Sequence, residues 1–135
     1  MKTTTTFVAD YDFQSVNETG NVIDIDMHKA EEKKHMSPTE LLLSALSACA
    51  SVDLVQMLKK RRKTVNALSV EADGIRRDEN PRGFTDITLT FTLDSPDANM
   101  EEFEKMGHLA ATKYCSVANS ISSAIHHKFV LNRPD

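Results

Sequence analysis

Two cysteines are the residues of this chain with the widest range of chemistry. Cys49 lies in a long apolar stretch, and Cys115 follows 66 residues later, in the run Lys113–Val117. A thiolate is a nucleophile, and neighbouring groups that lower the thiol pKa make it reactive. Free cysteines also serve as small, buried packing residues, and the spacing alone does not separate these two roles. The next question is which elements hold the two thiols.

Cys49 lies in the segment Ser37–Lys63, which predicts a long helix. Ser37 suits the N-cap, the proline after it suits the first helical position, and Glu40 completes a capping box. Apolar residues run almost the whole way round this helix between 41 and 58, so most of its surface must be covered. Cys49 comes twelve positions after Ser37, beyond the reach of the helix dipole. A lowered pKa therefore requires a tertiary neighbour such as Arg, Lys or His.

Three other polar features have structural interpretations. Glu40 lies roughly opposite Cys49 on a continuous helix, and its capping position already explains it. The basic run Lys59–Lys63 occupies the last turns of the helix, where cations complement the carbonyl end. His126 and His127 are adjacent and lack metal-ligand spacing, so we expect no metal site. Phosphate-binding and nucleophile-elbow motifs are absent from the sequence.

The segment before the helix predicts a hairpin. Phe7–Phe13 alternates apolar and polar residues, the turn-rich Asn17–Asn21 follows, and Ile23–Met27 alternates again. This pattern is typical of two or three strands with one buried face. His28–His35 is a charged connection that we expect to be exposed.

The segment after the helix predicts a second hairpin, a second helix and a final strand. Alternating runs on either side of the turn Asn80–Gly83 predict the hairpin. Asn99 with Glu102 predicts a capping box, and apolar residues at helical spacing continue from Phe103 to Ile125, with Gly107 or the residues around Cys115 as points of interruption. Lys128–Asn132 reads as a short last strand.

This order of elements predicts an α+β fold in a single domain over residues 1–135. A chain of this length has too few other elements to cover a helix that is apolar on almost every side. We therefore expect a homodimer in which a second subunit completes the covering.

Composition limits the partners and the compartment. The formal net charge of −4 and the pI of about 5.7 offer no attraction to nucleic acid or to an anionic membrane surface. The N-terminus lacks a signal-peptide pattern, and we expect no membrane span, because no apolar run approaches the roughly 20 residues that one needs. We expect a cytoplasmic protein with two free thiols rather than a structural disulfide.

Together these features resemble the OsmC/Ohr family of thiol-dependent hydroperoxide reductases. The resemblance rests on Ser37–Leu43 followed by Ser47-Ala48-Cys49, on Arg76-Arg77 through Phe84-Thr85 in the second hairpin, and on Lys113–Val117 around Cys115. It covers most of the chain and keeps the order strand, helix with Cys, hairpin, helix with Cys, strand.

The resemblance implies an intertwined homodimer with two sites and no cofactor. Cys49 would attack an organic hydroperoxide, and Cys115 would resolve the product as a disulfide that a dithiol reductant then reduces. Family peroxidases use an arginine from before the first helix and a carboxylate directly after its first proline. Here no arginine precedes Arg61, and Thr39 holds the carboxylate position. Arg76, Arg77, His35 or Lys34, from the dimer partner or from a loop, are the candidates to replace the arginine.

A second hypothesis assigns the same dimeric fold to a non-catalytic protein that binds a small molecule. Its apolar pocket would lie along the central helix, with both cysteines as packing residues.

Overall fold

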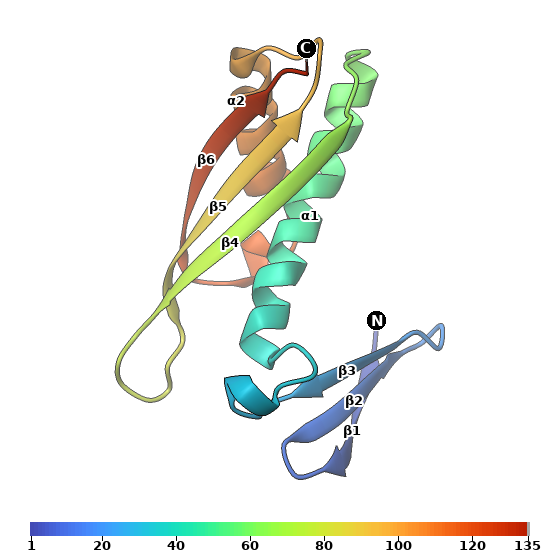
Figure 1. The fold of residues 1–135 in the computed structure, drawn as a ribbon, viewed down its shortest axis with the longest axis vertical. Helices are drawn as coiled ribbons and strands as arrows, with labels where there is room; N and C mark the ends of the chain where they lie inside the picture. Colours follow the sequence, from blue (N-terminus) through green and yellow to red (C-terminus); the bar gives the residue numbers. More distant parts are fainter. Residues whose placement is uncertain (135) are drawn as a thin grey trace. The chain divides into compact units, whose positions relative to one another are not determined.

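The computed structural model describes residues 1–134. These residues form two compact units, and the chain passes from the first to the second between Leu42 and Leu43. Each unit contains one three-stranded sheet, and helix α1, Pro38–Lys60, begins in the first unit and continues in the second (Figure 1). The α+β fold class predicted from the sequence is confirmed.

The N-terminal sheet has three antiparallel strands in sequence order: β1 (Thr3–Ala9), β2 (Asp12–Asn17) and β3 (Val22–Asp26). The structure has three strands, within the two or three predicted, but the alternating run Phe7–Phe13 is divided between β1 and β2. The chain turns at Tyr11, whose φ of 67° is left-handed, and Ala9 pairs with Asp12. The alternation of apolar residues continues across this turn, so the sequence pattern gave no sign of the turn.

The expected buried face of this sheet is not covered in the structure. Every residue of β1 is exposed, and the exposed fractions of Phe7, Val8 and Tyr11 are 62%, 60% and 63%. The sheet therefore presents large apolar side chains on its surface.

The start of α1 confirms the predicted capping box. Ser37 Oγ accepts the Glu40 N–H at 3.2 Å, and the Ser37 N–H donates to Glu40 Oε1 at 3.1 Å. A single-turn 3₁₀ helix, η1 (Ala30–Glu32), precedes this cap in the charged connection.

The end of α1 is a Schellman motif. The Lys63 N–H donates to Leu58 O at 3.0 Å, and the Arg62 N–H donates to Lys59 O at 2.9 Å. Arg62 takes the left-handed position with φ 60°, where glycine is usual.

Helix α1 is buried along one stripe only. Leu46, Ala50, Leu54 and Leu58 have no exposed area, whereas Val52 is 61% exposed. The prediction that no segment is long and apolar enough to cross a membrane was wrong, because an 18-residue window of this 23-residue helix has a mean hydropathy of 1.8. Only 22% of that window is buried, along the stripe that packs in the core.

The second sheet has the order β4–β5–β6. The predicted hairpin is confirmed as the antiparallel strands β4 (Ala67–Arg76) and β5 (Phe84–Asp94), and β6 (Ala124–Asn132) pairs with β5 in parallel. Helices α1 and α2 lie on the same face of this sheet (Figure 1). The core lies between the sheet and the two helices, and its largest buried members include Phe91, Phe103, Leu46, Leu54 and Ile87.

The second helix is shorter than predicted. α2 (Met100–Leu109) continues as one π-helical turn, η2 (Ala110–Tyr114), and ends before Cys115. A short 3₁₀ turn, η3 (Ala118–Ser120), follows, and β6 begins four residues before the predicted Lys128. Ile121 and Ile125 therefore lie outside the helix. They share its spacing because both pack against the same core as the helix does.

Two details of α2 also differ from expectation. Gly107 does not interrupt the helix, and a Cβ there would collide with the ring of Phe129 on β6, so the glycine permits close approach. Asn99 caps the helix by accepting the Glu102 N–H at 2.8 Å. The Glu102 carboxylate pairs with Arg61 and Lys63 at 3.6 and 3.4 Å, so only half of the predicted capping box forms.

Candidate functional site

The structure brings the two cysteines together. Cys49 lies in the middle of α1 and is partly exposed, whereas Cys115 comes directly after η2 and is buried. Both are free, and their thiols are joined by a hydrogen bond. Two sulfurs in contact and not bonded covalently form a dithiol pair able to close to a disulfide.

Backbone N–H groups after Cys115 face the two sulfurs. The N–H groups of Val117 and Ser116 hydrogen-bond to Cys49, and the N–H of Ala118 donates to Cys115 Sγ at 3.3 Å. Successive N–H groups that point to one side form a concavity that binds an anion. This turn is therefore suited to hold a thiolate.

The pKa values of the two thiols move in opposite directions. The Val117 N–H is the largest influence on Cys49, and with the Cys115 thiol and the Ser116 N–H it lowers the pKa of Cys49, against the opposing effect of burial. Burial is the largest influence on Cys115 and raises its pKa. Cys49 is therefore the sulfur that more readily becomes a thiolate.

One charge acts against this activation. Asp53 lies four residues after Cys49, which places the two side chains on the same face of α1. Its negative charge raises the pKa of Cys49, so it limits the lowering that the N–H groups provide.

The turn that holds Cys115 is fixed by Asn119. The Asn119 side-chain amide donates to Thr112 O at 3.1 Å and to Cys115 O at 2.8 Å, and its backbone N–H also donates to Cys115 O at 3.1 Å. These bonds join η2 to η3 across the cysteine. A π-helical turn is a common local feature of functional sites, and here it ends the helix where Cys115 is needed.

The arginines proposed as substitutes are engaged elsewhere. Arg76 Nε donates to Arg82 O at 2.8 Å, and Arg77 pairs with Glu79 at 3.7 Å, so both belong to the turn between β4 and β5. Sequence reasoning sought a cation and missed the N–H groups of Ser116 and Val117. The only signal in the sequence was the expected interruption of the helix near Cys115.

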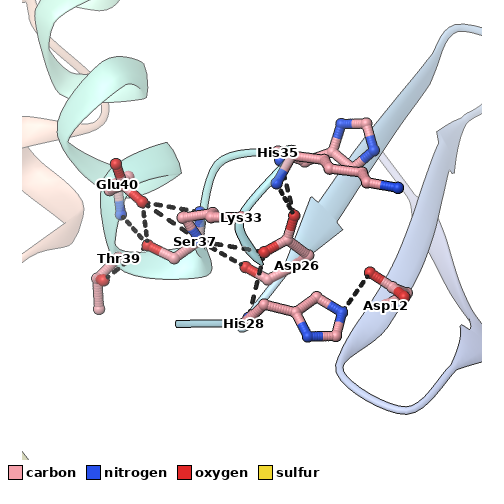
Figure 2. Close-up of polar contacts among 9 residues, drawn as sticks. Asp12, Asp26, His28, Lys33, His35, Ser37, Thr39 and Glu40 are labelled. Carbon is pink, nitrogen blue, oxygen red and sulfur yellow. Dashed lines mark hydrogen bonds and ion pairs between the residues drawn. The ribbon is translucent and has the colours of Figure 1, made fainter. Parts of the chain in front are cut away.

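The other two candidates, Lys34 and His35, lie in the N-terminal unit, where their backbone groups bind Asp26. Asp26 is fully buried, and its Oδ2 accepts the N–H groups of Lys34 at 2.9 Å and His35 at 2.7 Å (Figure 2). Oδ1 accepts the His28 N–H at 3.2 Å and lies 3.4 Å from Lys33 Nζ. Burial opposes ionisation, but these hydrogen bonds outweigh it and hold the pKa of Asp26 well below its usual range. Asp26 thereby fixes the course of the connection to α1.

Glu40 and Thr39 take part in the helix start. Glu40 Oε1 accepts from Ser37 Oγ at 2.8 Å and lies 3.6 Å from Lys33 Nζ, and Thr39 Oγ1 is 3.3 Å from Ser37 Oγ (Figure 2). The Ser37 backbone N–H is the main cause of the lowered pKa of Glu40. The interpretation of Glu40 as a cap is confirmed.

The two adjacent histidines point to opposite faces of β6. His126 pairs with Asp86 at 2.9 Å on the outer face, and the His127 ring lies 5.1 Å from the His108 ring on the inner face. Burial, with His108 and His126 nearby, lowers the pKa of His127. Within residues 1–134, no three His, Cys, Asp or Glu side chains gather as ligands for a metal ion.

Comparison with known proteins decides the family. The family model described as OsmC-like protein matches residues 30–130. The chain belongs to the OsmC-like family. Protein YhfA of Escherichia coli K12 is similar to it, with 37% identity over 93 residues, which are 69% of this chain and 69% of YhfA.

Solved OsmC-like structures share the fold. The OsmC-like protein of Mycoplasma pneumoniae matches with a TM-score of 0.85 and 21% identity, covering 97% of this chain and 96% of that one. The organic hydroperoxide resistance protein OhrB of Bacillus subtilis matches with a TM-score of 0.62 and 18% identity, covering 96% of each chain. At these identities the likeness shows the OsmC-like fold, and the chemistry depends on the residues around Cys49.

Proposed function

We propose that this protein is a thiol-dependent reductase of organic hydroperoxides, with Cys49 as the attacking thiol and Cys115 as the resolving thiol. The observation that carries the proposal is the contact between the two free thiols, whose pKa values move apart. Such an asymmetry supports different roles for the two sulfurs. The thiolate attacks the hydroperoxide, and the neutral thiol reacts only in the later step that forms the disulfide.

The proposed reaction has three steps. The Cys49 thiolate attacks one peroxide oxygen, an S–O bond forms, the O–O bond breaks, and the alkoxide takes a proton and leaves as the alcohol. Cys115 sulfur then attacks the Cys49 sulfenic acid, which forms the disulfide and releases water. A dithiol reductant exchanges with this disulfide and restores both thiols, so one dithiol and one hydroperoxide give one disulfide, one alcohol and one water.

In this proposal the N–H groups of Val117 and Ser116 stabilise the Cys49 thiolate, the role that the resemblance to the family assigns to an arginine. A hydrogen bond to the charged form of a group lowers its pKa as a nearby cation does. Both donors come from the segment that carries Cys115. The attacking and resolving sulfurs are thus held by one turn.

Membership of the OsmC-like family supports the proposal, as does the shared fold with proteins described as organic hydroperoxide resistance proteins. The function is expected in the cytoplasm, where dithiol reductants keep the two cysteines reduced.

The test is the rate of thiol loss after the reduced protein is mixed with cumene hydroperoxide. We expect fast loss in the wild type and slow loss in Cys49→Ser. In Cys115→Ser the Cys49 sulfenic acid should accumulate and be trapped by dimedone. Thiol loss in the wild type that is no faster than in Cys49→Ser would reject the proposal and favour the non-catalytic binding protein.

A homodimer is the second part of the proposal. Residues Ala45, Ala48 and Val52 form an exposed apolar stripe on α1, and β1 presents Phe7 and Val8 to solvent. Exposed apolar surfaces of this kind favour association. Sedimentation equilibrium at micromolar concentration should give a dimer, and Val52→Asp should weaken it while the matched change Val130→Asp, on the outer face of β6, should not. A wild-type monomer would contradict this part.

A further inference from the structure

Asp53 is the one charged residue in the apolar part of helix α1, and the proposed reaction does not use it. The stretch from Leu41 to Leu58 contains no other Asp, Glu, Lys, Arg or His. Asp53 comes four residues after Cys49, about 6 Å further along the helix axis, so the two side chains share a face. A negative charge therefore lies within about one helical turn of the attacking sulfur.

No cation of the chain pairs with Asp53. Its side chain is half-buried, and among residues 1–134 no Lys, Arg or His nitrogen lies within 4.0 Å of its carboxylate. Its charge is felt at Cys49, where it raises the pKa of the thiol. The carboxylate thus acts on the attacking sulfur without a partner to offset it.

The segment that faces Cys49 supplies little positive charge. Lys113 is the only charged residue between Ala110 and Ser123, and its Nζ lies 5.5 Å from the centre of the Tyr114 ring. The backbone N–H groups that hydrogen-bond to Cys49 are dipoles without a net charge. They stabilise the thiolate, but they do not neutralise Asp53.

This arrangement treats a thiolate and an anionic substrate differently. An arginine would attract both, because it carries a full positive charge. The N–H groups favour the thiolate at the position where they point, and the ionised site then holds two negative charges, on Cys49 and on Asp53. The exposed neighbours of Cys49 on the helix, Ala45 and Val52, are apolar. An uncharged organic group meets no repulsion here, whereas a carboxylate does.

We propose that Asp53 is a specificity-determining residue, which restricts the attacking thiol to uncharged organic hydroperoxides and rejects those that carry a carboxylate near the peroxide group. The inference rests on the proposed reductase function and names its substrate class. Two like charges about 7 Å apart repel each other enough to lower a rate roughly threefold in water and more than tenfold near a protein.

The test compares two derivatives of cumene hydroperoxide, one with a carboxylate in the para position of the ring and one with the methyl ester of that carboxylate. The rate of thiol loss is measured for the full-length reduced protein. In the wild type the ester should react at least about tenfold faster than the carboxylate. In Asp53→Asn this ratio should fall at least about threefold. The ratio is used because a change in the pKa of Cys49 affects both substrates equally.

Two control variants should keep the wild-type ratio. Asp53→Glu retains the charge on the same face of α1. Glu71→Gln removes a charge from β4 on the side of the sheet away from the helices, because its neighbours Val70 and Ala72 pack against the core.

A second pair of reagents tests the repulsion without a hydroperoxide. Iodoacetamide and iodoacetate both lose iodide to the Cys49 thiolate, and only iodoacetate is an anion. Asp53→Asn should raise the rate with iodoacetate, relative to iodoacetamide, at least about threefold, as measured by mass spectrometry of the Cys49 peptide.

Equal rates for the ester and the carboxylate in the wild type would overturn the inference. So would ratios that Asp53→Asn leaves unchanged for both pairs of reagents. Thiol loss with neither hydroperoxide would instead reject the reductase function and, with it, this substrate class. The alkylation ratio would still show whether Asp53 repels an anion, so the two failures are distinguishable.

Discussion

The thiols of Cys49 and Cys115 are hydrogen-bonded to each other, although 66 residues separate them in the sequence. The contact joins the middle of a helix to a turn, and only the turn supplies backbone N–H groups to both sulfurs. This arrangement lowers the pKa of Cys49, while burial raises the pKa of Cys115.

The first prediction concerns the Val117 N–H. Val117 has φ −67°, which suits proline, so Val117→Pro removes this N–H with little change of backbone angle. The pKa of Cys49 should rise, and its thiolate at pH 7 should fall about tenfold or more, since a hydrogen bond to a charged group is worth about 1.5–3 kcal/mol. The measurement is the pH dependence of Cys49 alkylation by iodoacetamide.

Val117→Ala is the control, because it removes the side chain and keeps the N–H. In the wild type and in this control, the alkylation midpoint should lie below the ordinary thiol pKa of about 8.5, because a lowered pKa keeps the thiolate present as the pH falls. Circular dichroism verifies that Val117→Pro is folded. An unchanged midpoint in folded Val117→Pro would show that this N–H does not stabilise the thiolate.

The second prediction concerns Asp53. Asp53→Asn removes a negative charge on the same face of α1 as Cys49, so the pKa of Cys49 should fall further. Alkylation at pH 7 should accelerate about threefold or more, because one unit charge at about 6 Å contributes roughly 0.7 kcal/mol in water and more near protein. Asp53→Glu keeps the charge and should change the rate little. Equal rates in the Asn and Glu variants would count against a charge effect.

The third prediction concerns Asp26. Asp26→Asn removes the charge that accepts the N–H groups of Lys34 and His35, so both amides should exchange with solvent at least about tenfold faster at pH 7. In the wild type their protection should persist down to about pH 3.9, the ordinary Asp pKa, and decline only below it, because the folded pKa is lowered.

Asp24→Asn is the matched control for this experiment. Asp24 is exposed and accepts only from the Gln14 side chain among residues 1–134. Its replacement should leave the Lys34 and His35 amides protected. Equal exchange in both variants would mean that Asp26 does not hold the connection.

The fourth prediction concerns the end of α1. Arg62→Gly should raise the free energy of unfolding by about 0.5–1 kcal/mol. Glycine removes the cost of about 1–2 kcal/mol that a side chain has in the left-handed region, but the greater entropy of glycine in the unfolded chain offsets part of this stabilisation. Lys60→Gly, inside the last helical turn, should lower it by about 0.5–1 kcal/mol. Urea unfolding measures both, and the same sign for the two variants would contradict the assignment of Arg62.

The sequence was a good guide where local rules decide the structure. The cap at Ser37, the second hairpin and the α+β order follow from residue type and spacing, and all are confirmed. It was a poor guide where one pattern serves two structures. Apolar alternation crossed the turn at Tyr11, and helical spacing continued past Cys115 to Ile121 and Ile125, which pack against the core from outside the helix.

The candidate site shows the same limit. The two cysteines could be named from the sequence, but their contact depends on packing between α1 and the turn after η2. The groups that act on Cys49 are backbone N–H groups, which every residue except proline carries. No sequence pattern marks them, and the search for an arginine therefore led to Arg76 and Arg77, which hold a distant turn.

The most direct test of the central claim is mass spectrometry of the reduced protein after reaction with one equivalent of cumene hydroperoxide. The account predicts a Cys49–Cys115 disulfide, a protein two hydrogens lighter and one equivalent of cumyl alcohol. Both thiols recovered free, with the hydroperoxide unconsumed, would contradict it.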